Sequence, residues 1–256
     1  MKRQYVSAVL ALLVCCAPLF AGAQEKNEGK LARVYTMVPK HGSGQALWEA
    51  LKAHAAYRTQ QGDPWTWRMY SVVNGKGLGN YVVRSGGHHW ADFDAYDTAS
   101  AKLNLSEHFN KTVQPHLAYV SSTINMDDDA HSHWVDNDNY RLFSITRYAI
   151  IPGKIGQFET ALGEIHKGLQ KQKWAKSYAF VNVVNGASGP TRILVLPREN
   201  WANFEAPKPS VMQVLASEYG KDKTEDMLNR YGSSYSSAQS SVIRYLPELS
   251  VLHESK

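Results

Sequence analysis

The stretch Val72-Val73-Asn74-Gly75 occurs a second time in this chain, as Val183-Val184-Asn185-Gly186. Trp90-Ala91-Asp92-Phe93 likewise returns as Trp201-Ala202-Asn203-Phe204, and both pairs are separated by 111 residues. Apolar positions upstream match at the same spacing: Leu47, Ala50 and Leu51 with Phe158, Ala161 and Leu162. One repeated motif is common by chance, but three in the same order at one spacing indicate an internal duplication.

Each copy has the same predicted order of elements: a strand, an amphipathic helix, two strands around a Gly-rich turn, a helical region and a last strand. The strands are expected at 31–38, 66–73, 80–84 and 122–126, and again at 140–151, 178–184, 191–196 and 241–246. The first helix of each copy carries an apolar stripe at helical spacing: Leu47, Leu51 and His54, then Phe158, Leu162, Ile165 and Leu169. The second helical regions are expected at 99–119 and 210–237, with interruptions near Pro115 and Gly220.

This order, β-α-β-β-α-β, is the α+β arrangement called split βαβ or ferredoxin-like, an antiparallel sheet with helices on one face. Several strands are apolar on both faces, so we expect the two sheets to pack together as an α/β barrel within one chain. The predicted organisation is a signal peptide at 1–23, a first repeat at 24–130, a linker at 131–139 and a second repeat at 140–256.

A duplicated β-α-β-β-α-β unit in which Trp-Ala-x-Phe opens the second helix resembles the dimeric α/β-barrel superfamily. The resemblance covers the whole chain after the signal. Members include small antibiotic-biosynthesis-type monooxygenases, haem-degrading proteins, chlorite-dismutase-like haem proteins, NIPSNAP-like proteins and stress-response barrels. The resemblance implies a monomer with a pseudo-dimeric core, equivalent to the dimer of single-copy relatives. It implies no particular activity, because the superfamily hosts unrelated chemistries.

The N-terminus is typical of an export signal. Lys2 and Arg3 precede an apolar run from residue 6 to 20, and Ala21-Gly22-Ala23 has the small residues that a signal peptidase prefers. Cleavage predicts a periplasmic or secreted protein with no membrane attachment; an uncleaved anchor, or a lipoprotein acylated at Cys15, are the alternatives. Because Cys15 and Cys16 are the only cysteines, the mature chain would contain none.

Charge and motifs exclude several classes. The net charge is +5, or +3 without Lys2 and Arg3, and the basic residues are scattered, so nucleic acid is not an expected partner. The chain has no Gly-x-Ser-x-Gly elbow, His-Glu-x-x-His motif, Walker loop or Rossmann fingerprint. The glycine-rich segment at 75–79 joins two strands and predicts a hairpin connection.

Histidines are the main catalytic candidates. His54 continues the apolar stripe of its helix and should face the sheet, where relatives of this fold bind ligands. His54 and His108 are therefore candidate catalytic residues, as a base in a pocket or as a haem ligand. The resemblance makes haem a conceivable cofactor, with His54, His108 or His166 as its axial ligand. A buried histidine bonded to a neighbour is the competing interpretation.

Aromatic residues are concentrated in the first hairpin, at Trp65, Trp67, Tyr70 and Tyr81, whereas its counterpart has only Tyr178 and Phe180. This asymmetry suits a flat apolar ligand as well as ordinary core packing. The candidate ligand-binding residues are Trp67, Tyr70, His54, Trp90, His88 and His89. The last two precede the second helix, where an exposed loop is the alternative expectation. Between the copies, residues 127–138 are rich in Asp and His but lack the glycine and terminal glutamate of a calcium loop. This segment predicts a solvated acidic linker, and no metal site is expected.

Three functions follow from these observations. The first is binding of a small apolar or aromatic molecule by the first copy of an exported tandem barrel. The second is an oxidoreductase, either a cofactor-poor monooxygenase or a haem-dependent enzyme. The third is a structural or protein-interaction module.

Overall fold

The computed structural model describes residues 29–253, so the predicted signal at 1–23 lies outside the described residues. The described residues contain eight strands in the predicted order. The helical region expected at 99–119 instead spans 90–112, with its break at 103–104 and not near Pro115. The strands are β1 (Leu31–Pro39), β2 (Arg68–Gly75), β3 (Tyr81–His88), β4 (Leu117–His133), β5 (Leu142–Ile150), β6 (Tyr178–Asn185), β7 (Thr191–Arg198) and β8 (Tyr235–Tyr245). The helices are α1 (Gly44–Gln61), α2 (Trp90–Lys102), α3 (Leu105–Thr112), α4 (Ile155–Lys171), α5 (Val211–Tyr219) and α6 (Lys221–Gly232).

The eight strands form one closed antiparallel barrel in the order β1-β3-β2-β8-β5-β7-β6-β4. The first four strands are neighbours in the order β4-β1-β3-β2, and the last four in the order β8-β5-β7-β6. The two halves join edge to edge, where β2 pairs with β8 and β4 pairs with β6. Closure leaves no strand edge unpaired, which removes a site of unwanted strand addition.

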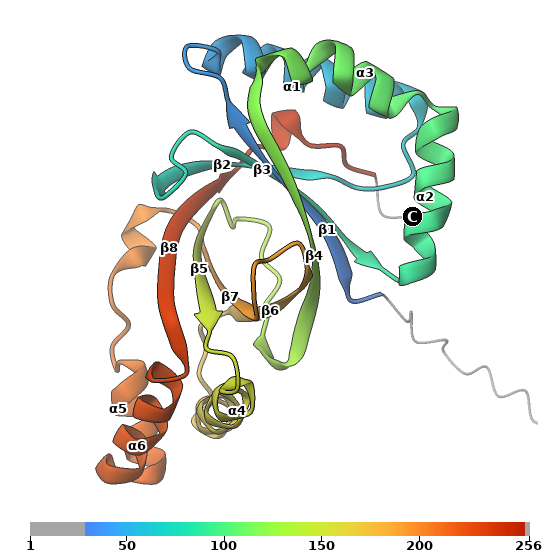
Figure 1. Ribbon diagram of the computed structural model, residues 1–256. Coiled ribbons are helices and arrows are strands. Elements are labelled where there is room, and N and C mark those ends of the chain that lie inside the picture. The colour runs from blue at the N-terminus through green and yellow to red at the C-terminus, as the bar shows by residue number, and fades with distance from the viewer. Residues whose placement is uncertain (1–28, 254–256) are drawn as a thin grey trace, which may run out of the picture.

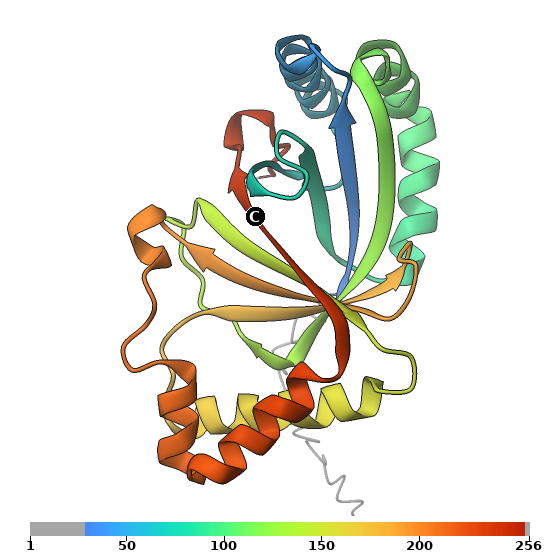
Figure 2. The ribbon, with the colours of Figure 1, turned by 60° about the vertical axis from the view of Figure 1, so that its left-hand side comes forward.

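The helices cover the outer faces of the two halves separately. Figures 1 and 2 show α1, α2 and α3 against the first half and α4, α5 and α6 against the second, at opposite ends of the molecule. Each half therefore has its own core between helices and sheet. The expected stripe of α1 is buried, with Leu47, Leu51 and His54 facing the sheet, and the stripe of α4 packs around Phe158 and Leu162.

The repeated Asn-Gly pairs lie at the two junctions between the halves. Gly75 has φ +87°, and a Cβ on it would lie 2.6 Å from the backbone oxygen of Ser240 in β8. Gly186 has φ +88°, and its Cβ would lie 2.5 Å from the backbone oxygen of Ser122 in β4. Only glycine tolerates both the left-handed backbone and this close approach. The Asn-Gly motif that occurs twice in the sequence thus also permits the two halves to join.

Two further segments differ from expectation. β4 continues to His133, so the start of the predicted linker belongs to a strand that pairs with β6. After β8 the chain returns to the first half, where Val251 forms an isolated bridge with Trp67 and Leu249 joins the core of α1. Within residues 29–253, no helix has both the length and the hydropathy needed to cross a membrane.

Candidate functional site

A cavity of about 330 Å³ lies in the first half, between the sheet and the helices α1, α2 and α3. Its apolar wall comes from β1, β2, β3, β4, α1, α3 and the C-terminal segment, including Met37, Leu51, Trp67, Met69, Val83, Phe109, Val120, Leu249 and Val251. Polar groups line other parts of it: Arg33, Tyr35, His54, Arg58, Tyr96, Asp97, Ser100, Ser106 and Asn110. An apolar pocket with a few polar groups is the usual form of a small-molecule site.

His54 lies in the cavity wall, and both of its ring nitrogens have partners. Its Nε2 accepts a hydrogen bond of 2.9 Å from Arg58 Nε, one helical turn further along α1. Its Nδ1 lies 3.0 Å from Nδ1 of His108 on α3. Arginine can only donate, so neutral His54 carries its proton on Nδ1 and donates it to His108.

The protonation state of His54 follows from this arrangement. Burial, then the positive charge of Arg58 and the proximity of His108, lower the pKa of His54 to about 3. The side chain is 6% exposed, so its charged form would lose most of its hydration. His54 is neutral at physiological pH, and in this arrangement it has no free lone pair with which to act as a base.

Arg58 connects His54 to a buried carboxylate. α1 ends at Gln61, and the next residue, Gly62, has a φ of +69° that turns the chain so that Asp63 comes back toward the last turn of the helix. Asp63 is completely buried and accepts from Arg58 Nη1 at 2.5 Å, from Tyr96 Oη at 3.2 Å and from the backbone N–H of Trp65 at 3.0 Å. Burial raises the pKa of Tyr96 to about 12, so this hydroxyl stays protonated.

Trp67 adds an unusual donor to the same wall. The Arg58 guanidinium carbon lies 5.0 Å from the centre of the Trp67 ring, within cation–π range. The indole Nε1 is buried and has no aligned hydrogen-bond partner within residues 29–253. It nevertheless stands near enough to Tyr96 to lower the pKa of that hydroxyl slightly, against the dominant effect of burial. This indole N–H is closed off from the cavity, so its contact with Tyr96 belongs to the buried network of Arg58 and Asp63.

The second half lacks this network. At the repeat spacing of 111 residues, His54, Arg58 and Asp63 correspond to Ile165, Leu169 and Trp174. These three pack in the core between α4 and its sheet. A buried ion pair is often no more stable than apolar residues of similar volume. The first half therefore retains a polar network that its counterpart shows to be unnecessary for the fold.

Of the other predicted residues, only some lie near the cavity. His108 stacks on Tyr57 at 4.0 Å between ring centres and touches His54, but it is not among the residues that line the cavity. His88 is buried, contrary to an exposed loop: it stacks on Trp65 at 3.7 Å and bonds Ser85 Oγ at 2.7 Å.

Besides His88, three ligand-binding candidates lie outside the cavity wall. Tyr70 contacts Phe143 and Tyr245 inside the barrel, because alternate strand residues face opposite sides of the sheet. His89 precedes α2, where the Asp92 carboxylate accepts from its backbone N–H at 2.6 Å, and Trp90 is 59% exposed at the first turn.

The residues of the cavity do not fit haem. An axial ligand needs a free imidazole nitrogen, and both nitrogens of His54 are bonded. We therefore derive no chemistry through haem at this site.

Arg58, Asp63 and Tyr96 were not among the sequence candidates. A signal for two of them existed: Arg58 falls one turn after His54 on the buried face of α1, and the second copy has leucine there. The exchange of Asp63 for Trp174 is the same kind of signal. Tyr96 had no signal, because its partners come from other elements.

The fold is similar to several solved structures. An anthrone oxidase-like protein matches 90% of this chain and 98% of its own, with a TM-score of 0.54 and 10% identity. A "putative monooxygenase" from Lactobacillus acidophilus matches 85% and 94%, with a TM-score of 0.52 and 7% identity. A mutant chlorite dismutase from Candidatus Nitrospira defluvii matches 87% and 94%, with a TM-score of 0.52 and 6% identity. No family model and no curated protein matches the sequence. At these identities the likeness shows the fold alone.

Proposed function

We propose that this protein binds a small aromatic molecule carrying an oxygen acceptor, in the cavity of the first half. The observation that carries the proposal is the difference between the halves. One contains the His54–Arg58–Asp63 network beside a cavity, whereas the corresponding residues of the other pack as an apolar core.

The size and chemistry of the cavity define the ligand class. At about 330 Å³ it is at the lower end of the roughly 300–1,000 Å³ typical of small-molecule pockets, which suits one or two fused rings. Trp67 and Phe109 offer aromatic surfaces. A carbonyl or phenol oxygen on the ligand would accept from polar side chains that line the cavity, such as Ser106 or Asn110.

Oxidation of such a molecule is the second candidate function. Its support is the fold shared with an anthrone oxidase-like protein and with proteins named as monooxygenases. A monooxygenase without a cofactor would need a base to take a proton from the substrate. His54 is neutral and both of its ring nitrogens are hydrogen-bonded, so it does not meet that need in this arrangement. Binding is therefore the better-supported proposal.

We also infer that the two halves are tandem ferredoxin-like units. The support is that both halves place their four strands in equivalent order and that the Asn-Gly pairs occupy equivalent junctions. A structural module without a ligand is less well supported, because the interior of the first half is not filled.

Isothermal titration calorimetry with 2-naphthol tests the proposed function. Val120 lines the cavity, and the larger side chain of Val120→Trp should fill it. Binding of 2-naphthol should then weaken at least about tenfold, which corresponds to about 1.4 kcal/mol of binding free energy. Tyr119 is the matched control, because it is 62% exposed on the same strand, and Tyr119→Trp should leave the affinity unchanged. No binding by the wild-type protein, or equal affinity in both variants, would overturn the proposal.

A further inference from the structure

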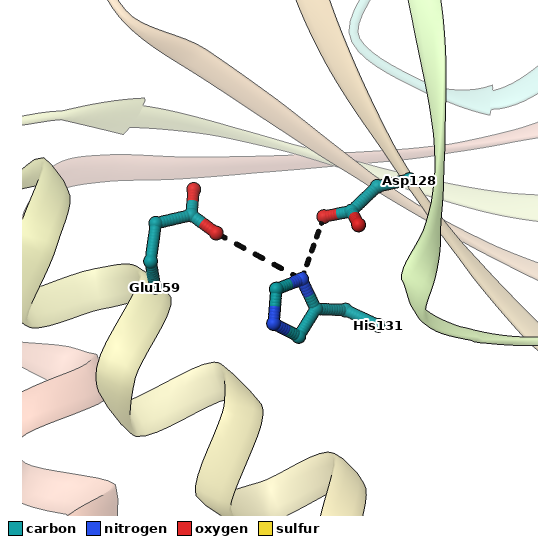
Figure 3. A group of neighbouring side chains, drawn as sticks. All are labelled: Asp128, His131 and Glu159. Carbon is teal, nitrogen blue, oxygen red and sulfur yellow. Dashed lines mark hydrogen bonds and ion pairs between the residues drawn. The ribbon is translucent and has the colours of Figure 1, made fainter. Parts of the chain in front are cut away.

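A second set of side chains, remote from the cavity, comes together between the two halves. Asp128 and His131 lie in β4, and Glu159 lies on α4 in the second half. Asp128 Oδ2 is 2.8 Å and Glu159 Oε2 is 3.8 Å from His131 Nδ1. Figure 3 shows the three side chains directed toward one another from the strand and the helix. We call them the β4–α4 cluster.

The backbone of β4 is shaped to present this cluster. The pairing of β4 with β6 jumps from Asp128 opposite Phe180 to His133 opposite Tyr178, so residues 129–132 bulge out of the ladder. Ser132 holds the bulge closed: its Oγ donates to the backbone oxygen of Asp128 at 2.6 Å and accepts from the N–H of Phe180 at 2.9 Å. Bulges of this kind redirect side chains, and here Asp128 and His131 point the same way.

The charges of the cluster favour a cation. Arg192 binds Glu159 through Oε1 only, with its Nε at 2.7 Å and its Nη2 also in contact, so Oε2 remains directed at His131. Two carboxylates and one guanidinium leave a net charge of −1. The side chains of Asp128, His131 and Glu159 are 10%, 20% and 29% exposed, so water screens this charge only partly.

We propose that the β4–α4 cluster binds a divalent transition-metal ion, with zinc as the reference ion. Ligand atoms about 2.1 Å from a tetrahedral zinc ion stand about 3.4 Å apart. The two distances to His131 Nδ1, 2.8 Å and 3.8 Å, lie on either side of this value. One imidazole and two carboxylates suit zinc or manganese, with water completing the coordination. The metal would take the place of a proton on His131 and would tie β4 to α4.

The test uses the untagged protein, stripped with EDTA and titrated with ZnCl₂ by calorimetry. We expect one site. Asp128→Asn, His131→Gln and Glu159→Gln should each weaken zinc binding at least about tenfold. This is the lower limit for loss of a residue that only hydrogen-bonds to a metal ligand, and loss of a ligand itself should cost no less. Two controls should stay within about twofold of wild type. His133→Gln changes the next histidine of β4, and Glu164→Gln changes another carboxylate of α4, one that pairs with Arg230.

Cobalt provides a measurement that does not depend on the variants folding equally well. Co²⁺ added to the wild-type protein should give a visible absorption band of an N/O-ligated site, and one equivalent of Zn²⁺ should abolish it. Zinc bound as tightly by His131→Gln as by wild type, or no saturable binding up to 1 mM zinc (about 4 kcal/mol), would overturn the proposal.

Discussion

Replacement of Asp63 by alanine should destabilise the protein strongly, because it leaves the Arg58 guanidinium without its buried counter-ion. The Asp63 side chain is fully buried and that of Arg58 is 19% exposed. Breaking one partner out of a buried ion pair costs about 3–5 kcal/mol. Trp65 N–H and Tyr96 Oη lose an acceptor as well, at about 1–3 kcal/mol each, although such losses are not additive. We expect about 4 kcal/mol or more, a large part of the stability of an ordinary domain.

The double variant Arg58→Leu/Asp63→Asn separates two quantities: the cost of leaving one charge of the pair without its partner, and the net contribution of the whole pair to the free energy of unfolding. Leucine is the residue of the second half at this position. The asparagine oxygen keeps an acceptor for the Trp65 N–H, and its amide N–H can donate to Tyr96 Oη. We expect its free energy of unfolding to return to within about 1–2 kcal/mol of wild type, because a buried ion pair contributes little net stability. It should also bind the aromatic ligand more weakly.

The assay for both variants is urea unfolding, followed by tryptophan fluorescence and circular dichroism. A loss below about 1 kcal/mol in Asp63→Ala would show that the pair is not buried as described. A double variant as unstable as the single one would refute the argument that the network is dispensable for folding.

Three further changes test other parts of the structure. The pKa of His54 is lowered from 6.5 to about 3, so the unfolded chain takes up a proton that the folded protein does not. The free energy of unfolding is therefore highest above pH 6.5 and falls with decreasing pH, by up to about 1.4 kcal/mol per pH unit. Urea unfolding from pH 7 to 4 should show a smaller decrease of this free energy in His54→Gln than in wild type. Tyr70→Ala should cost about 2–4 kcal/mol by removing its contacts with Phe143 and Tyr245, yet leave 2-naphthol binding in calorimetry unchanged. Gly186→Ala should cost at least about 1–3 kcal/mol in urea unfolding, because alanine resists positive φ and its Cβ meets β4; a neutral result would remove the steric account of the junction.

Much of the local structure could be predicted because it depends on short-range patterns. Helical spacing placed Leu47, Leu51 and His54 on one buried face, and the α1 they belong to has that face against the sheet. Strand ends were less predictable. β4 was expected to end at Met126, yet it continues to His133, since its partner β6 comes from the other half.

The candidate site was predictable only in part. The helical stripe pointed to His54, and Trp67 was expected beside it. His54 forms hydrogen bonds with both His108 and Arg58, and so has no free nitrogen to act as a base. The bond with His108 depends on how α3 lies over α1, which the sequence does not show. Tyr70 was misplaced because its neighbours in the sequence suggested one aromatic cluster, whereas a strand sends alternate side chains to opposite faces.

The sequence by itself determined the order of strands and helices, because periodicity and turn residues act over a few positions. The asymmetry between the halves was also visible there, as polar residues in one half against apolar residues in the other. Only the tertiary structure decided how the halves join, since strand pairing between β2 and β8 connects residues far apart in the chain. It also decided that the C-terminal segment covers the cavity of the first half, and that Asp128 and His131 meet Glu159. Such contacts depend on the geometry of barrel closure, for which no local pattern in the chain provides a signal.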